Sequence, residues 1–340
     1  MIKKIKKWII KTIPYPNSKM DIELSELNKS EPYCTLVATG DITLAYHFDK
    51  AVEPNSSFEP FINFRDIFKN NITLINLEAP ITNSNDRFPN KTFTFKSSPS
   101  YVKYIKEASI DIVNLANNHI GDFGVKGIDE TIQILFDNNI QYVGAGTNFE
   151  NAREPKIIEK NNIKIAFLGY DDVFLKFLAE NNKSGVAYIS HNFEKEIKNA
   201  KNQADIVCVS IHFGTERMPS PSERQKNLAT TAIDYGADIV IGHHPHTIQG
   251  FTKYQSKITN NYGIIFYSLG NFCFGGNNNP SDKDTFIPLL TIQKDGVKKV
   301  NIIPCKISSK ENTNDFLPII VCGNEKRRIL YKLKKRNQYV

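Results

Sequence analysis

The chain has 340 residues, of which 40% are hydrophobic, so it can bury the core of one large domain or two smaller ones. Its net charge of +7 is concentrated at the ends: residues 1–11 carry five lysines and no acid, and residues 325–340 carry seven bases and one acid. The remaining residues therefore have a net charge of −4, the difference between +7 overall and +11 at the two ends. A mildly acidic body suits cation binding and argues against a nucleic-acid binder, which would carry a basic stripe across its folded face.

The cysteines and the N-terminal segment bear on where the protein works. Five cysteines are scattered along the chain without a CxxC pair, which favours reduced thiols and a reducing compartment over a disulfide framework or a zinc site. The longest unbroken apolar run near the N-terminus is Trp8–Ile10, too short for a signal peptide or a transmembrane helix, so we expect a cytoplasmic protein. Apolar residues recur at helical spacing between the lysines of residues 1–11, which is compatible with peripheral contact with an anionic membrane or with a solvated basic helix.

Apolar stretches of strand length alternate with helical patterns through most of the chain, which is typical of an α/β architecture. Strands are predicted at residues 35–39, 72–76, 111–115, 140–144, 163–169, 205–211, 238–242 and 264–269. Helices are predicted at residues 100–108, 124–138, 193–203 and 221–235. The helix at 124–138 has Ile128, Ile132 and Leu135 on one face and stops at an Asn-Asn pair.

Two further segments have distinct local patterns. After Pro280 the chain turns to β character, and the pattern around residues 294–296 predicts a hairpin. Residues 83–100 are polar and rich in Pro, Ser and Asn, which predicts a long surface loop, and loops of this length are usually functional or disordered.

Polar residues follow several predicted strands at the point where each strand ends. Three segments run from a helix end through Asp-Ile-Val into a strand and then into histidine. Because the carboxyl ends of parallel strands meet at one edge of a sheet, residues distant in sequence converge there. The polar clusters are Gly40-Asp41, Asn76-Leu77-Glu78, Asn117-Asn118-His119, His212–Glu216 and Gly242–His246.

Together these clusters offer carboxylate, amide and imidazole groups, the mixture that Zn²⁺, Mn²⁺ or Fe²⁺ accept. A carboxylate can bridge two such ions about 3.5–4 Å apart. Each cluster alone has a simpler explanation: a Gly-Asp turn, a glutamate near a helix N-cap, or a half-buried histidine after a strand. Five of the seven histidines lie at predicted strand ends, however, and the set as a whole therefore favours a metal or phosphate site.

The ordered clusters, followed by "SLGNF" at 268–272, resemble the CapA family of capsule and poly-γ-glutamate biosynthesis proteins, a divergent branch of the calcineurin-like metallophosphoesterases. The resemblance runs from about residue 34 to residue 275. It implies an α/β fold in a four-layer αββα sandwich over residues 31–310. A basic segment at 1–30 would precede this domain, and a basic tail at 311–340 would follow it.

The resemblance also implies roles for individual residues. Asp41 would bind the first metal, Glu78 would replace the bridging aspartate, and Asn118 and His212 would bind the second metal. His244 and His246 would each bind one ion, and His119 would be the catalytic residue that stabilises or protonates the leaving group. The supporting or pocket-lining residues would be His243, which is additional and would orient a ligand imidazole, and Asn76, Glu216, Ser268 and Asn271. Ser268 and Asn271 could instead simply turn the chain after a strand.

One position departs from the wider superfamily, whose first motif is Asp-x-His: the third residue here is Thr43, so the first metal loses an imidazole. We expect a CapA-type metal-dependent hydrolase, or a transferase-associated protein, that works with capsule-synthesis machinery on an anionic polymer, poly-γ-glutamate or capsular polysaccharide, or on a phosphorylated small substrate. The alternatives are a non-catalytic, metal-containing polymer-binding or assembly subunit, a general metallophosphoesterase, and a nucleic-acid phosphodiesterase recruited by the basic ends. Arg87, Lys91 and Lys96 on the 83–100 loop could attract an anionic substrate, or could be ordinary solvated charges.

Overall fold

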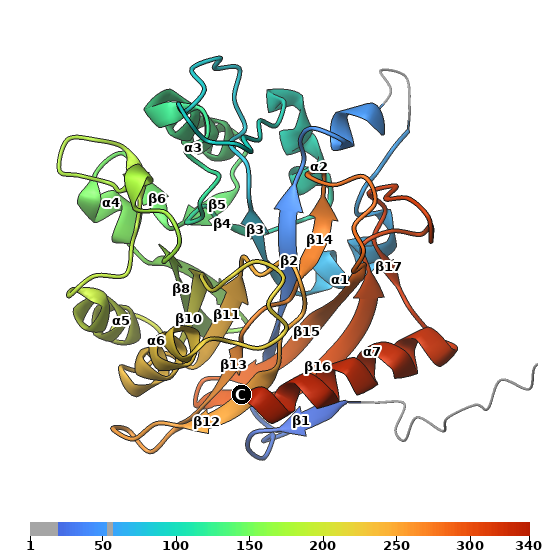
Figure 1. The fold of residues 1–340 in the computed structure, drawn as a ribbon. Helices are drawn as coiled ribbons and strands as arrows, with labels where there is room; N and C mark the ends of the chain where they lie inside the picture. Colours follow the sequence, from blue (N-terminus) through green and yellow to red (C-terminus); the bar gives the residue numbers. More distant parts are fainter. Residues whose placement is uncertain (1–19, 53–56) are drawn as a thin grey trace, which may run out of the picture.

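The structure is a computed structural model that describes residues 20–52 and 57–340 (Figure 1). It is a mixed α/β protein, as predicted, with a nine-stranded sheet, a six-stranded sheet and a small two-stranded sheet. The segment 1–11, for which we considered membrane contact, lies outside the described residues.

The nine-stranded sheet has the order β1-β16-β15-β2-β3-β4-β5, with β14 paired to β2 and β17 to β16. Strands β2 to β5 and β14 are parallel, and β15 and β16 form the predicted antiparallel hairpin. The strands are β1 (Asp21–Glu23), β2 (Cys34–Thr43), β3 (Ile72–Leu77), β4 (Ile112–Asn114), β5 (Gln141–Val143), β14 (Asn271–Phe274), β15 (Asp284–Gln293), β16 (Gly296–Lys306) and β17 (Ile319–Ile320).

The six-stranded sheet has the order β12-β13-β11-β10-β8-β7, and its four central strands are parallel. Its strands are β7 (Lys156–Lys160), β8 (Ile163–Asp171), β10 (Ile206–His212), β11 (Ile239–His243), β12 (Phe251–Gln255) and β13 (Tyr262–Phe266). The two-stranded sheet pairs β6 (Ala145–Gly146) with β9 (Gly185–Val186).

Helices α2, α3, α5 and α6 occupy the four segments predicted to be helical. The α-helices are α1 (Arg65–Asn70), α2 (Val102–Glu107), α3 (Gly124–Asp137), α4 (Phe149–Arg153), α5 (Phe193–Lys201), α6 (Glu223–Asp234) and α7 (Gly323–Arg336). Short 3₁₀ turns lie at Phe48–Lys50, Ile62–Phe64, Pro99–Tyr101, Leu175–Phe177 and Asn337–Tyr339. The predicted apolar face of α3 is buried, since Ile128, Ile132 and Leu135 are at most 8% exposed.

Three large hydrophobic clusters account for most of the buried apolar side chains. One cluster joins both sheets and contains Leu74 from β3 together with Phe167 from β8 and Cys208 from β10. A second cluster packs α1, α2 and α3 on the nine-stranded sheet, and a third packs α5 and α6 on the six-stranded sheet. Because the central parallel strands are buried on both faces, they are continuous apolar runs such as "IVCVSI" in β10.

The basic C-terminal segment, which we described as a tail, contains the 14-residue helix α7. Ile329, Leu330 and Leu333 of this helix are buried and belong to the cluster that joins the two sheets. Among the residues that the structure describes, no helix combines the length and the apolar character needed to span a membrane.

Candidate metal centre

The carboxyl ends of parallel strands from both large sheets bring the predicted polar clusters together. Asp41 comes from β2 and Glu78 directly follows β3, whereas His212 and His243 end β10 and β11 of the other sheet. The side chains of His212 and Glu78 approach to 3.4 Å, and those of His243 and Asp41 to 3.1 Å. The site therefore lies where the edges of the two sheets meet.

Glu78, His244 and His246 form the most compact set of possible metal ligands, because one donor atom from each lies within 4.8 Å of the other two. Glu78 is fully buried, and neither of its carboxylate oxygens accepts a hydrogen bond from the described residues. The Nδ1 atom of His244 is also buried without a hydrogen-bond partner among them. Leaving such groups unsatisfied costs on the order of 1–3 kcal/mol each, and more when the group is charged. A divalent cation between these atoms would remove that cost, so the residues fit a metal.

The carboxylate of Asp41 is held by several donors. Asn76 Nδ2 donates to Oδ1 at 2.9 Å, the backbone N–H of His244 donates to Oδ2 at 3.3 Å, and the Nδ1 atoms of His243 and His246 lie at 3.1 and 3.2 Å. Burial alone would raise the pKa of Asp41, but the hydrogen bonds from His243 and His246 hold it well below its ordinary value. Asp41 is thus an ionised carboxylate that orients two imidazoles.

His246 connects the two carboxylates. Its Nδ1 atom lies 2.9 Å from Oδ1 of Asn271 and 3.2 Å from Asp41, and its Nε2 atom lies 3.6 Å from Glu78. Burial would lower the pKa of His246, but the negative charges of Glu78 and Asp41 raise it to about 10. A carboxylate that fixes one nitrogen of a histidine while the other faces an ion is a common arrangement in metal sites. Nε2 is therefore the nitrogen that can bind a metal.

Glu78 differs from Asp41 because burial outweighs the opposing effects on its pKa and raises it. Desolvation raises the pKa of Glu78 well above its ordinary value, although the charge of His246 opposes the shift. Burial also lowers the pKa of His212 well below its ordinary value and that of His244 to about 3, so both imidazoles are neutral, the form that binds metals. His212 Nε2 lies 2.9 Å from Oδ1 of Asn118, which places this predicted pair side by side.

His119, the predicted catalytic residue, is buried next to these groups. Its Nδ1 atom lies 2.7 Å from Asp122 Oδ2, and Asp122 also accepts hydrogen bonds from Lys91 Nζ and the backbone N–H of Phe95. Lys91 also donates to the carbonyl oxygen of Asn118. Burial lowers the pKa of His119 despite the opposing charge of Asp122. Asp122 and Lys91 thus fix the ring of His119 from the side opposite its Nε2 atom.

A chain of amide hydrogen bonds crosses three neighbouring strands below the site. Asn114 Nδ2 in β4 donates to Asn76 Oδ1 in β3 at 2.9 Å, and Asn76 donates in turn to Asp41 in β2. A Cβ atom at Gly169 of β8 would lie 2.2 Å from Oδ1 of Asn114, so glycine is required there. The sequence patterns did not single out Asn114, Gly169 or Asp122, although Asn114 lies three residues before the predicted cluster Asn117–His119.

Residues 243–248, which we call the histidine loop, have a strained backbone. His244 has φ +96° and His246 has φ +52°, although neither is glycine. Sparsely populated backbone conformations cost on the order of 1–3 kcal/mol each and persist only where surrounding contacts enforce them. One such contact is the hydrogen bond of 2.8 Å from the backbone N–H of Arg217 to the carbonyl oxygen of Pro245.

The remaining predicted residues have mixed positions. Ser268 Oγ donates to the carbonyl oxygen of Thr247 at 2.8 Å and accepts the backbone N–H of Gly270, so it turns the chain before β14. Thr43 Oγ1 donates to the carbonyl oxygen of Glu78 at 3.2 Å, so its hydroxyl supports the backbone of that residue. Glu216 is exposed on the loop after β10.

The basic residues of the 83–100 loop are engaged within the protein. Arg87 donates to the carbonyl oxygens of Lys91 and Thr92 at 3.2 and 3.3 Å, and Lys96 donates to that of Ser84 at 3.0 Å. These contacts lie within the loop, and Lys91, which donates to Asn118 and Asp122, attaches the loop beside the site.

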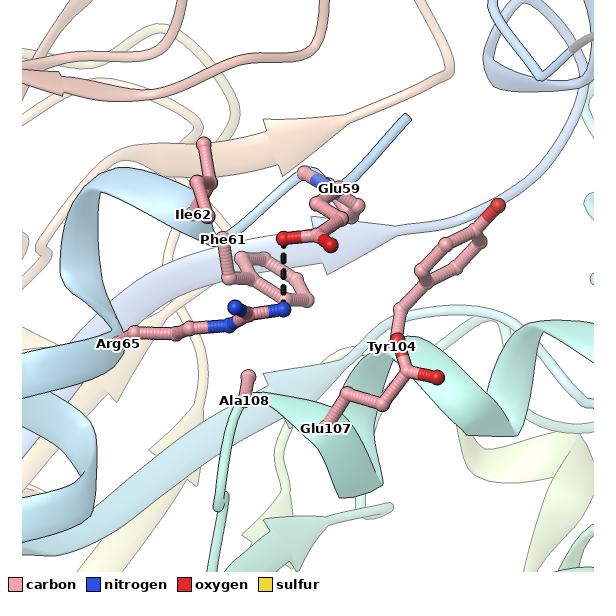
Figure 2. Close-up of a pocket in the computed structure, with 8 residues that line it drawn as sticks. Glu59, Phe61, Ile62, Arg65, Tyr104, Glu107 and Ala108 are labelled. Carbon is pink, nitrogen blue, oxygen red and sulfur yellow. Dashed lines mark ion pairs between the residues drawn. The ribbon is translucent and has the colours of Figure 1, made fainter. Parts of the chain in front are cut away.

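A separate pocket lies beside α1 and α2, away from every predicted site residue (Figure 2). It contains the ion pair of Arg65 and Glu59 at 2.6 Å, with Tyr104 and Glu107 facing it from α2. Its cavity volume of about 10 Å³ is close to the space of a single water molecule, so it is too small for a substrate.

The comparisons with known proteins concern the same part of the chain. The sequence model of the family "bacterial capsule synthesis protein PGA_cap" matches residues 35–276, which include every predicted site residue. The chain is 32% identical over 283 residues to the capsule biosynthesis protein CapA of Bacillus anthracis, covering 80% of this chain and 67% of that protein. It is 33% identical over 273 residues to the PGA biosynthesis protein CapA of Bacillus subtilis, covering 79% and 70%. A probable polyglutamine synthesis accessory protein of Mycobacterium tuberculosis is 27% identical over 199 residues, covering 55% and 52%.

Proposed function

Because the chain belongs to the bacterial capsule synthesis protein family PGA_cap, we propose that it is a metal-dependent hydrolase that acts in the synthesis, transfer or trimming of an anionic capsule polymer. The polymer would be poly-γ-glutamate or a capsular polysaccharide. The observation that carries the proposal is the fully buried carboxylate of Glu78, which faces His212 and His246 and lacks a hydrogen bond from the described residues. A fully buried carboxylate that faces imidazoles and receives no hydrogen bond is the environment of a cation site.

The proposed site would hold one or two ions of Mn²⁺, Zn²⁺ or Fe²⁺. Its ligands would be Asp41, Glu78, Asn118, His212, His244 and His246, with Glu78, His244 and His246 at its centre. When bound, a divalent cation would polarise a phosphoryl or acyl oxygen and lower the pKa of a water molecule. His119 would hold or deliver a proton at the leaving atom through Nε2, since Asp122 occupies its other nitrogen.

The proposal extends to the architecture and the location of the protein. A four-layer αββα sandwich is supported by the cluster that joins the two sheets and by the helices packed on the outer face of each. We propose a cytoplasmic location with contact to capsule-synthesis machinery. If residues 1–11 bind anionic membranes, their removal will abolish sedimentation with anionic liposomes, and unchanged sedimentation would exclude this contact.

Metal analysis and a substrate screen test the function. Purified protein should contain a transition metal and should hydrolyse a phosphomonoester, a phosphodiester or poly-γ-glutamate in the presence of Mn²⁺. His119→Ala should lose turnover but retain the metal, because His119 contacts Asp122 and Lys91 and not the central donor atoms. Protein that contains no metal and gains no stability from added metal would refute the proposal.

A second candidate function is a metal-containing, non-catalytic subunit that binds or assembles the polymer. Thr43 favours it, because its hydroxyl supports the backbone of Glu78 where a second imidazole would complete a two-metal phosphoesterase site. Bound metal without turnover on any substrate, together with binding of poly-γ-glutamate, would select this function over hydrolysis.

A further inference from the structure

Helix α7 has a row of basic residues on one face. Arg328, Lys332 and Arg336 recur every four residues and therefore lie one above the other along the helix. Arg328 Nη1 donates to Asp284 Oδ2 at 2.7 Å, and Lys332 Nζ donates to Asp282 and Asp284 at 2.8 Å. The first two residues of the row thus attach α7 to the start of β15 and the residues before it.

The third residue of the row contacts the histidine loop itself. Arg336 Nη1 donates to Thr247 Oγ1 at 3.1 Å and to the carbonyl oxygen of Ile248. Thr247 Oγ1 donates in turn to Asp282 Oδ2 at 2.9 Å. Thr247 therefore links Asp282, which binds Lys332 of α7, to Arg336 at the end of the same helix. A continuous set of hydrogen bonds therefore runs from α7 to the residue after His246.

The chain after the histidine loop is shaped to receive the end of α7. A Cβ atom at Gly250 would lie 2.7 Å from the carbonyl oxygen of Arg336 and 2.6 Å from Cγ1 of Val340. The backbone N–H of Phe251 donates to Asn337 Oδ1 at 2.9 Å. In Figure 1 the C-terminus accordingly lies next to β12, the strand that begins at Phe251.

The conformation that these contacts stabilise is the one the metal site needs. His244 and His246 adopt positive φ angles, and in this conformation of the loop one donor atom of each lies within 4.8 Å of a carboxylate oxygen of Glu78. Two residues from segments inside the family match also restrain the loop. Ser268 Oγ donates to the carbonyl oxygen of Thr247, and the backbone N–H of Arg217 donates to that of Pro245. Arg336 adds a restraint from a helix beyond residue 276, where the family match ends.

We propose that α7 positions the histidine loop for metal binding, with Arg336 as the positioning residue that holds Thr247 and Ile248. The inference rests on the proposed metal site but concerns the loop in the absence of metal as well. In this proposal the basic residues of α7 bind acidic and polar groups of the protein itself and do not serve to recruit a polyanion.

Two measurements on the full chain test the inference. Hydrogen exchange in EDTA should show at least about tenfold faster exchange of the amides of residues 243–250 in Arg336→Gln. The dissociation constant for Mn²⁺ or Zn²⁺ should rise by about 10–100-fold, the usual effect of losing a residue that orients a ligand. Arg336→Lys should restore part of both effects because it keeps one donor and the charge.

Lys334→Gln is the matched control, since Lys334 is exposed on the same helix and forms no ion pair or hydrogen bond with the described residues. It removes the same charge and should match the wild type in both measurements. Thr247→Val is the second variant: it removes the hydroxyl that Arg336 and Asp282 share and should accelerate exchange in the loop while α7 stays protected.

The outcomes separate this inference from the proposed function. If the wild type binds no metal, the proposed function fails, and the exchange of residues 243–250 still decides whether α7 positions the loop. Loop exchange that is unchanged in both Arg336→Gln and Thr247→Val would overturn the inference, whatever the metal affinity.

Discussion

Replacing Glu78 with glutamine tests the central feature of the site. Glu78 is fully buried, and desolvation raises its pKa well above the ordinary value. Without metal, glutamine has nearly the same shape as a protonated glutamate, and shape-conserving substitutions usually cost less than about 1.5 kcal/mol. With metal, the substitution removes the negative charge that a cation requires.

The expected size of the effect follows from the length of the chain. Unfolding entropy of about 2.1 cal/mol/K per residue gives roughly 0.7 kcal/mol/K for 340 residues. A ligand at a thousandfold excess over its Kd stabilises the folded state by about 4.1 kcal/mol, which corresponds to a rise in Tm of about 6 °C. The cost of the Glu78→Gln substitution without metal corresponds to no more than about 2 °C.

Thermal unfolding followed by intrinsic fluorescence, in EDTA and with Mn²⁺ or Zn²⁺, measures both quantities. Wild-type protein should gain about 6 °C with metal, and Glu78→Gln should gain less than about 1 °C while keeping its Tm in EDTA within about 2 °C of the wild type. Glu107→Gln is the control, since Glu107 is an exposed carboxylate of α2 beside the small separate pocket and should keep the full metal effect. A Glu78→Gln variant that retains the full rise would show that Glu78 is not a ligand.

Three further predictions concern the fold around the site. Gly40→Ala should lower the free energy of unfolding by about 3 kcal/mol in urea titrations, because its Cβ would lie 2.2 Å from the carbonyl oxygen of Gly270; a neutral effect would contradict the close approach of these segments. Burial would raise the pKa of Asp284, but the hydrogen bonds and charges of Arg328 and Lys332 together hold it below its ordinary value. This stability is present above about pH 3.9 and lost as the pH falls through the folded pKa, so Asp284→Asn should be less stable than the wild type at pH 7 and converge with it in acid. In the native protein, of the five free thiols only Cys322 is exposed, so a thiol reagent should titrate one cysteine quickly and the other four only after unfolding.

Local structure was predictable from this sequence because its patterns are strong. The apolar face of α3 and the continuous apolar run of β10 have the periods of a helix and of a buried strand, and both elements lie within two residues of the prediction at either end. The gathering of polar residues was also predictable, since parallel strands share one carboxyl edge. That rule applies within each sheet. It does not account for the contact of His212 with Asn118, 94 residues apart in sequence, because they follow strands of different sheets and meet only through the packing of the two sheets.

The supporting residues were not predictable, because their roles depend on three-dimensional contacts that no periodicity records. Asp122 lies in a turn three residues after His119, and only the folded chain shows that it also binds Lys91 from the 83–100 loop. The C-terminal segment was described by its net charge, which hides the four-residue spacing of Arg328, Lys332 and Arg336. The net charge of this segment suggested a tail. The four-residue spacing of its basic residues is instead typical of one face of a helix.

The two buried carboxylates of the site differ in the partners that the protein supplies to them. Asn76 Nδ2 donates to Asp41, and the Nδ1 atoms of His243 and His246 lie 3.1 and 3.2 Å from its carboxylate oxygens; with these neighbours the pKa of Asp41 stays well below the ordinary value despite burial. Burial shifts the pKa of Glu78 in the opposite direction, and no described residue donates a hydrogen bond to it. Neighbouring acids with opposed shifts usually have separate roles. Since the described residues donate hydrogen bonds to the carboxylate of Asp41 and none to that of Glu78, Glu78 is the carboxylate of the proposed site whose burial a bound cation would offset.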